Sequence, residues 1–326
     1  MSDKKKILVI QSIHKAGIEL LENNPKYEFE IIENIDQKDI KSKIAECDGL
    51  SIRTAKLSSE LINCSKKLEI ISRHGVGYDN IDISSSKEKN ITLAITATAN
   101  AVAVAEHVMF MLLNISKRRN MYDKTVKSGN FSDRNKLPKT IELWNKNILI
   151  AGFGRIGRSL IKRCIAFEMK INVYDPFVND EVISALGGKK IQNLDSGLKE
   201  CDFLTIHMPL NSDTKNLINY ERLKKMKKNS IIINTARGGI INEKDLDKAL
   251  NDNVIFGAGC ALSDDGVCSY RGVKTPSLTR AECETTFVCS DVTLTTEADC
   301  LRGVCSSPSK TSRETCEMGD CIRSID

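Results

Sequence analysis

The chain has 326 residues, of which 41% are hydrophobic and 28% charged, and its formal net charge is +5. This length allows two domains of ordinary size, each with its own core. The start, MSDKKKILVI, lacks the features of a signal peptide, and no apolar run approaches the ~18 residues of a membrane span. Composition therefore argues against a membrane protein and predicts a soluble protein of the cytoplasm.

Charge and cysteine content change near residue 260. Residues 1–259 hold 41 Lys and Arg against 32 Asp and Glu, whereas residues 260–326 hold 7 against 11. The positive surplus of the first part is spread along the chain, which favours small anions over the clustered footprint of a nucleic acid. Eight of the 12 cysteines lie in residues 260–326, a density typical of disulfide or metal modules.

The first lobe, residues 1–100, alternates short apolar strands with helices. We expect strands at 6–10, 28–32, 49–53, 68–72 and 91–95, with helices between them, for example at 14–23 and 36–46. Such alternation predicts a parallel sheet covered on both faces. Residues 101–120 are expected to form one long connecting helix that packs against another surface.

The second lobe, residues 101–259, includes this connecting helix and a second alternating series. Its expected strands are 147–151, 171–174, 203–206, 230–235 and 254–257. Together the two lobes predict an α/β protein with two doubly wound parallel sheets, followed by an atypical Cys-rich tail.

A glycine motif opens the second series. Gly152, Gly154 and Gly157 follow an apolar strand and begin a helix, and Asp175 ends the next strand. The glycines permit a tight turn, close approach to a pyrophosphate and helix–strand packing, while the carboxylate can accept ribose hydroxyls. Since that carboxylate would repel a 2′-phosphate, the pattern predicts NAD rather than NADP as cofactor.

Five segments in order resemble the D-2-hydroxyacid dehydrogenases: RHGVGYDNID (73–82), ANAVAVAEH (99–107), GFGRIGR…VYDP (152–176), HMPL (207–210) and NTARGGIINE (234–243). The resemblance covers residues 5–259 and is greatest to D-3-phosphoglycerate dehydrogenases without a regulatory domain. It implies a flavodoxin-like substrate lobe, a Rossmann NAD lobe and an active site between them. It also implies hydride transfer between NAD and a 2-hydroxy or 2-oxo acid, with 3-phosphoglycerate of serine biosynthesis as the expected substrate.

Residue roles follow from the matching positions. The resemblance assigns the substrate carboxylate to the loop of Gly75, Val76 and Gly77, and the catalytic arginine, which also borders the cofactor, to Arg237. The remaining cofactor positions it implies are Gly152, Gly154, Arg155, Ile156, Gly157, Asp175, Met208, Pro209, Thr235 and Ala236.

The family's acid–base histidine and its supporting glutamate have no counterpart. No histidine follows His207, and the positions of the supporting glutamate and of the acid that holds the nicotinamide amide carry Gly266 and Ala261. We expect His74 and His207 to have structural or orienting roles, His107 to contribute to packing and His14 to lie at a helix start.

The tail repeats at a period of 16–17 residues through the pairs Cys283/Cys289, Cys300/Cys305 and Cys316/Cys321. Disulfides conflict with a reducing compartment, and the spacing without histidine disfavours zinc, so no metal site is expected. A gene-model or assembly join near Cys260 explains the composition break, the charge reversal and the lost catalytic residues together.

Three functions stay open. The chain is a dehydrogenase for 3-phosphoglycerate or, alternatively, a hydroxypyruvate or glyoxylate reductase; it is a catalytically impaired NAD-binding protein; or it is an interaction protein that binds through its cysteine repeats. The apolar helix 101–120 predicts a homodimer formed through the cofactor lobe. Neither a nucleic acid nor a membrane is expected as a partner.

Overall fold

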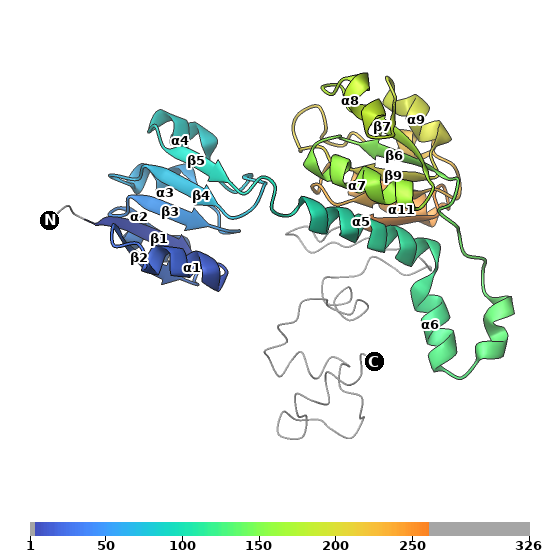
Figure 1. Ribbon diagram of the computed structural model, residues 1–326, viewed down its shortest axis with the longest axis horizontal. Helices are drawn as coiled ribbons and strands as arrows, with labels where there is room; N and C mark the ends of the chain where they lie inside the picture. Colours follow the sequence, from blue (N-terminus) through green and yellow to red (C-terminus); the bar gives the residue numbers. More distant parts are fainter. Residues whose placement is uncertain (1–3, 261–326) are drawn as a thin grey trace. The chain divides into compact units, whose positions relative to one another are not determined.

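The computed structural model describes residues 4–260, so the cysteine repeats, Ala261 and Gly266 lie outside the described residues. The chain divides into two compact units between Ala103 and Val104. Figure 1 shows that each unit is a sheet with helices packed on it.

The first unit contains a five-stranded parallel sheet in the order β2-β1-β3-β4-β5. Its strands are β1 (Lys5–Ile10), β2 (Tyr27–Ile32), β3 (Gly49–Ile52), β4 (Ile70–Arg73) and β5 (Thr92–Ile95). Its helices are α1 (Lys15–Glu22), α2 (Gln37–Ile44), α3 (Ser59–Cys64) and α4 (Ile83–Glu88). This strand order is flavodoxin-like and confirms the predicted doubly wound sheet, whose ligand edge lies at the carboxyl ends of the strands.

The second unit contains a six-stranded parallel sheet in the order β11-β10-β9-β6-β7-β8. Its strands are β6 (Asn147–Ala151), β7 (Lys170–Tyr174), β8 (Lys189–Lys190), β9 (Phe203–Ile206), β10 (Ile231–Asn234) and β11 (Gly257–Cys260). The helices that follow them are α7 (Arg155–Ala166), α8 (Asp180–Ala185), α9 (Leu194–Glu200), α10 (Tyr220–Leu223) and α11 (Glu243–Asn251). The order reverses between β6 and β9, which is the Rossmann arrangement and places a crevice at the carboxyl ends of these strands.

The expected single helix 101–120 is wrong, because the segment forms two helices. They are α5 (Ala101–Ser116) and α6 (Arg119–Lys127), followed by the 3₁₀ turn η1 (Phe131–Lys136). Between the two helices Arg118 has φ +51°, a left-handed conformation that ends α5. Contacts stabilise it there: its guanidinium lies 4.5 Å from the Phe256 ring centroid and donates to the Lys139 carbonyl. Within residues 4–260 no helix is long and apolar enough to cross a membrane.

The last strand is also displaced from its expected position at 254–257. The apolar residues before it cover the end of α11 instead, and Ile255 is buried there. Strand β11 is made of GAGC, because small residues are needed under α5. A Cβ on Gly259 would lie 2.9 Å from the side chain of Ile233 and 3.0 Å from the sulfur of Met111.

Candidate active site

Two glycines, one directly after β6 and one in the first turn of α7, are required by the fold itself. Gly152 has φ +97°, and a Cβ there would lie 2.7 Å from the carbonyl group of His207. A Cβ on Gly157, in the first turn of α7, would lie 2.6 Å from the Gly152 carbonyl oxygen. The loop therefore rests directly on the end of β9, with no room for side chains.

Gly154 differs, because its missing side chain leaves open space. A Cβ there would meet nothing within 4 Å. The residue is the N-cap of α7 and makes no side-chain capping bond, so the first N–H groups of this 12-residue helix face that space. Arg155, the first helical residue, is exposed beside them. N–H groups, helix dipole and open space together fit a pyrophosphate.

Asp175, directly after β7, is bonded to the glycine loop. Its Oδ2 accepts the Phe153 N–H at 2.7 Å, and its Oδ1 accepts the Phe177 N–H at 2.9 Å. Each carboxylate oxygen retains a further lone pair, so the group can also accept ribose hydroxyls. The acid and the glycine loop are thus one hydrogen-bonded assembly, which fits a bound dinucleotide.

His207, directly after β9, is held between two threonines. Its Nε2 lies 2.8 Å from Oγ1 of Thr205, and its Nδ1 lies 3.4 Å from Oγ1 of Thr235. Burial lowers the pKa of His207 to about 4. The ring is therefore neutral and both nitrogens are engaged, which fits the expected orienting role. Met208 and Pro209 follow it, and the Pro209 carbonyl accepts the Thr214 hydroxyl at 2.6 Å.

Arg237 lies in the loop after β10, close to the carboxyl edge of the sheet. It is exposed, and its Nη1 donates to the Ala236 carbonyl at 2.7 Å. The buried Asn234 bonds the same loop through both ends of its amide: Oδ1 accepts the Ala236 N–H and Nδ2 donates to the Arg237 carbonyl. Sequence reasoning missed Asn234, although an Asn that ends the buried run IIIN is a signal for a side chain bonded to the following turn.

In the first unit, the loop after β4 also presents backbone groups. Gly75 has φ +143°, and a Cβ there would collide with the guanidinium of Arg73. Within residues 4–260, the N–H groups of Val76 and Gly77 donate to no acceptor. Adjacent N–H groups without internal partners can receive a carboxylate.

Arg53, which sequence reasoning missed, lies at the same edge of the first sheet. It follows β3, the neighbour of β4 in the sheet, with Ile52 paired to Arg73. Its side chain is exposed, and Nη1 donates to the Ser12 carbonyl at 3.2 Å. Arg53 and the Gly75 loop come together only because β3 and β4 pair in the folded sheet. The residues around Arg53 therefore give no local sequence signal of this neighbour.

The other histidines do not form an acid–base pair. His14 caps α1, where its Nδ1 accepts the Ala16 N–H at 3.2 Å. The ring of His107 stacks on Phe110 at 5.8 Å between centroids, and His74 is exposed in the first unit. In the described part of the chain, none of the four histidines contacts a carboxylate, and no group of residues there could hold a metal ion.

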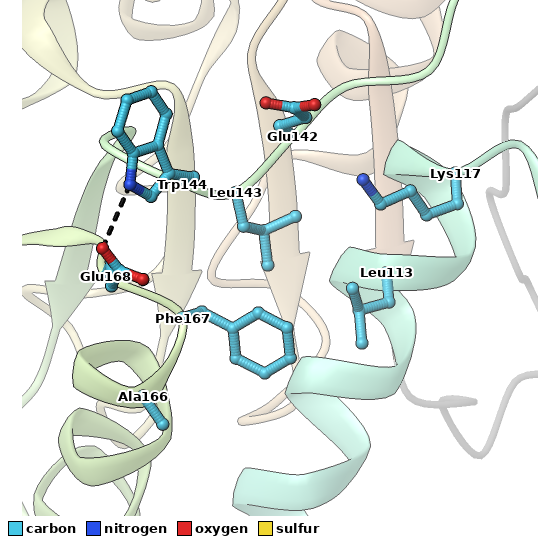
Figure 2. Close-up of a pocket in the computed structure, with 8 residues that line it drawn as sticks. All are labelled: Leu113, Lys117, Glu142, Leu143, Trp144, Ala166, Phe167 and Glu168. Carbon is cyan, nitrogen blue, oxygen red and sulfur yellow. Dashed lines mark hydrogen bonds between the residues drawn. The ribbon is translucent and has the colours of Figure 1, made fainter.

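A pocket of about 350 Å³ lies elsewhere on the second unit (Figure 2). Trp144 and Glu168 lie next to each other at one side of it, and the Trp144 indole N–H donates to Glu168 at 3.1 Å. These residues precede β6 and β7, so the pocket lies at the amino ends of the strands, away from the glycine loop. It is lined by Leu113, Lys117, Glu142, Leu143, Trp144, Ala166, Phe167 and Glu168.

Comparisons with known proteins agree with this geometry. Residues 109–263 match the family described as D-isomer specific 2-hydroxyacid dehydrogenase, NAD binding domain. Hydroxypyruvate reductase of Thermotoga maritima is 36% identical over 256 residues, which cover 78% of this chain and 81% of that protein. D-3-phosphoglycerate dehydrogenase of Methanocaldococcus jannaschii is 36% identical over 261 residues, which cover 80% of this chain but only 49% of the relative. The chain thus spans about half of that longer protein.

Solved structures give the same result. D-lactate dehydrogenase from Aquifex aeolicus, complexed with NAD and lactic acid, has a TM-score of 0.73 at 28% identity, covering 80% of this chain and 78% of that one. NAD-dependent formate dehydrogenase from Staphylococcus aureus, in complex with NAD, has a TM-score of 0.70 at 28% identity, covering 79% and 81%. The chain therefore belongs to the D-isomer specific 2-hydroxyacid dehydrogenases, a family of NAD-dependent enzymes that act on CH–OH groups.

Proposed function

We propose that this chain binds NAD through the second unit and that its chemistry is hydride transfer between NAD and a 2-hydroxy or 2-oxo acid in the cytoplasm. The observation that carries the proposal is the assembled cofactor edge: the glycine loop, Asp175 and the ends of β9 and β10 are joined by hydrogen bonds within this unit. NAD supplies the hydride acceptor or donor when bound. Calorimetric titration of NAD into the full chain tests the binding step, and absence of binding would contradict the proposal.

Each residue then has a physical role. The α7 amides beside Gly154, Arg155 and Ile156 would receive the pyrophosphate, and Asp175 the adenosine ribose. Met208 and Pro209 would line the nicotinamide side, and Thr235 and Ala236 would also border the cofactor. Arg237 would bind the 2-oxo carboxylate through two N–H groups and polarise the carbonyl. In the first unit, the loop of Gly75, Val76 and Gly77 would offer backbone amides to a carboxylate.

For the substrate we propose 3-phosphoglycerate. Relatives with 36% and 32% identity are D-3-phosphoglycerate dehydrogenases, and Arg53 provides a further cation at the edge that carries the Gly75 loop. We expect NAD-saturated protein to bind phosphohydroxypyruvate at least about tenfold more tightly than hydroxypyruvate, as one phosphate contact predicts. Arg53→Gln should remove this preference, whereas Lys56→Gln, which changes a nearby exposed cation, should not.

Hydroxypyruvate or glyoxylate reduction is the second candidate. It is favoured by the hydroxypyruvate reductase relative and by glyoxylate reductase of Pyrococcus furiosus, which is 33% identical and matched over 80% of its length. Equal affinity for phosphorylated and unphosphorylated oxo acids would support it. A role for the cysteine repeats in binding a partner is a third candidate, to be tested by removing residues 261–326.

We further propose that the chain forms a homodimer through α5 and α6. Phe110 and Val102 on α5 are 45% and 55% exposed, and α6 has no buried residue and an exposed Val126. Figure 1 shows α6 standing apart from the sheet of its unit. Such apolar exposure on successive helices is typical of an interface. Light scattering at micromolar concentration should show a dimer, and Phe110→Asp should shift it towards monomer; a wild-type monomer would contradict the proposal.

A further inference from the structure

The turn that carries Arg237 is bonded from inside the protein by one side chain. Asn234 is the last residue of β10 and is only 7% exposed. Its Oδ1 accepts the Ala236 N–H at 3.0 Å, and its Nδ2 donates to the Arg237 carbonyl at 2.8 Å. One amide therefore holds the Thr235–Ala236 peptide group and the Arg237–Gly238 peptide group, which lie on either side of the segment Ala236–Arg237.

An apolar residue would not serve at this position. The three preceding residues, Ile231, Ile232 and Ile233, are fully buried, and a fourth would suit the strand equally well. It would leave the Ala236 N–H and the Arg237 carbonyl without their present partners at the edge of the sheet. An Asn side chain supplies one acceptor and one donor at the right separation.

Other contacts hold neighbouring residues of the loop. The Thr235 hydroxyl lies 3.4 Å from Nδ1 of His207, and the Gly239 carbonyl accepts the Asn216 N–H at 2.7 Å. Asn234 therefore bonds the backbone of Arg237 directly, and the Arg237 side chain is exposed.

We propose that Asn234 is a positioning residue that sets the direction from which Arg237 meets the 2-oxo carboxylate. This inference rests on the proposed role of Arg237. Because preorganised donors bind an anion without first ordering the loop, loss of Asn234 should weaken carboxylate binding more than cofactor binding.

The experiment uses the full chain and titrates NAD first and then hydroxypyruvate into NAD-saturated protein, a pair that cannot react. The variants are Asn234→Ala, Arg237→Ala and their combination. Asn234→Asp, which keeps the acceptor for the Ala236 N–H, serves if the alanine variant fails to fold. Asn242→Ala is the matched control, since this half-buried Asn also accepts a backbone N–H, that of Asp245 at the start of α11. Amide hydrogen exchange of residues 235–238 is recorded for every variant.

We expect Asn234→Ala to weaken hydroxypyruvate binding about tenfold or more, with NAD affinity changed less than about threefold and loop exchange at least about tenfold faster. The same substitution should have no further effect on hydroxypyruvate once Arg237 is Ala, and Asn242→Ala should leave both affinities unchanged. Equal weakening of both ligands, additive effects in the double variant, or unchanged loop exchange would overturn the inference. If the wild-type protein binds no hydroxypyruvate, the proposed substrate chemistry fails, and loop exchange alone then decides whether Asn234 fixes the turn.

Discussion

The carboxyl edges of the two sheets are built differently. In the second unit the ligand edge is tied together by its own side chains: Asp175 to the glycine loop, His207 to Thr235, and Asn234 to the Arg237 turn. In the first unit the loop at Gly75 presents the N–H groups of Val76 and Gly77, which donate to no acceptor among the described residues 4–260. The side chains of the second unit thus hold its ligand edge together before a ligand binds, and the first amides of α7 remain open there. In the loop at Gly75, by contrast, the described residues supply no side chain that bonds the open amides.

Because of this difference, we expect cofactor binding and catalytic turnover to depend on different parts of the protein. An edge that is preorganised loses little entropy when it binds, so the cofactor half of the site can work within the second unit alone. Proton transfer, in contrast, needs a correctly placed acid–base group, and no histidine in the described residues is paired with a carboxylate for that task.

The largest effect concerns turnover. With NADH and hydroxypyruvate or phosphohydroxypyruvate, we expect a rate ~10²–10⁴ below that of relatives with an acid–base histidine, because a positioned proton-transfer group contributes about that factor. NADH absorbance provides the measurement, and NAD binding by the same sample is the control for folding. A turnover of ~1–10³ per second would contradict the prediction and indicate that His74 or His207 moves the proton; substituting each by Asn would show which.

Two glycine substitutions distinguish a glycine that leaves room for the cofactor from a glycine that the fold itself requires. Gly154→Val places a side chain in the open space beside α7, so NAD affinity should fall about 100-fold or more while the unfolding temperature without NAD changes little. Gly157→Val instead meets the Gly152 carbonyl and should lower the free energy of unfolding by roughly 1–3 kcal/mol. Calorimetry and thermal melts measure the two effects. If both variants lost the same amount of stability, Gly154 would also be required for the packing of the folded protein.

Asp175 should have two separable effects. Removing its charge in Asp175→Asn should reduce the preference for NAD over NADP about 10- to 100-fold, equivalent to about 1–3 kcal/mol. Asp175→Ala should do the same and should also lower the free energy of unfolding by about 1 kcal/mol, since the Phe153 and Phe177 amides lose their acceptor. Titration of both cofactors and denaturant unfolding are the measurements. Equal affinity of the wild-type protein for NAD and NADP would contradict the assignment.

The burial of His207 should make the free energy of unfolding depend on pH, with a smaller effect than those above. An unfolded histidine takes up a proton near pH 6.5, whereas burial holds the folded His207 neutral down to about pH 4. Its contribution to stability is therefore complete above pH 6.5 and is lost as pH falls towards 4, by up to about 3 kcal/mol. Denaturant unfolding between pH 4 and 7 should show this slope, and His207→Asn should flatten it. An NMR titration of the His207 ring with a midpoint near 6.5 would contradict the prediction.

The sequence by itself determined the two doubly wound sheets and the cofactor loop. Alternating apolar strands and helices have a local period, and the glycines and Asp175 are identified by their spacing after a strand, whereas Arg237 is identified by the resemblance to the family. Most strands begin and end within two residues of the expected positions, because buried parallel strands are short apolar runs with distinct boundaries.

Tertiary contacts decided the rest. The break between α5 and α6 depends on Arg118 meeting Phe256 and the Lys139 carbonyl, and the shift of β11 depends on close packing of Gly259 beneath α5. Likewise, the bonds that bring His207 to Thr235 join strands β9 and β10, 28 residues apart in sequence. A local pattern reports which residues favour a strand or helix. It does not report which distant backbone will come within contact distance, and at such points packing and hydrogen bonding override local preference.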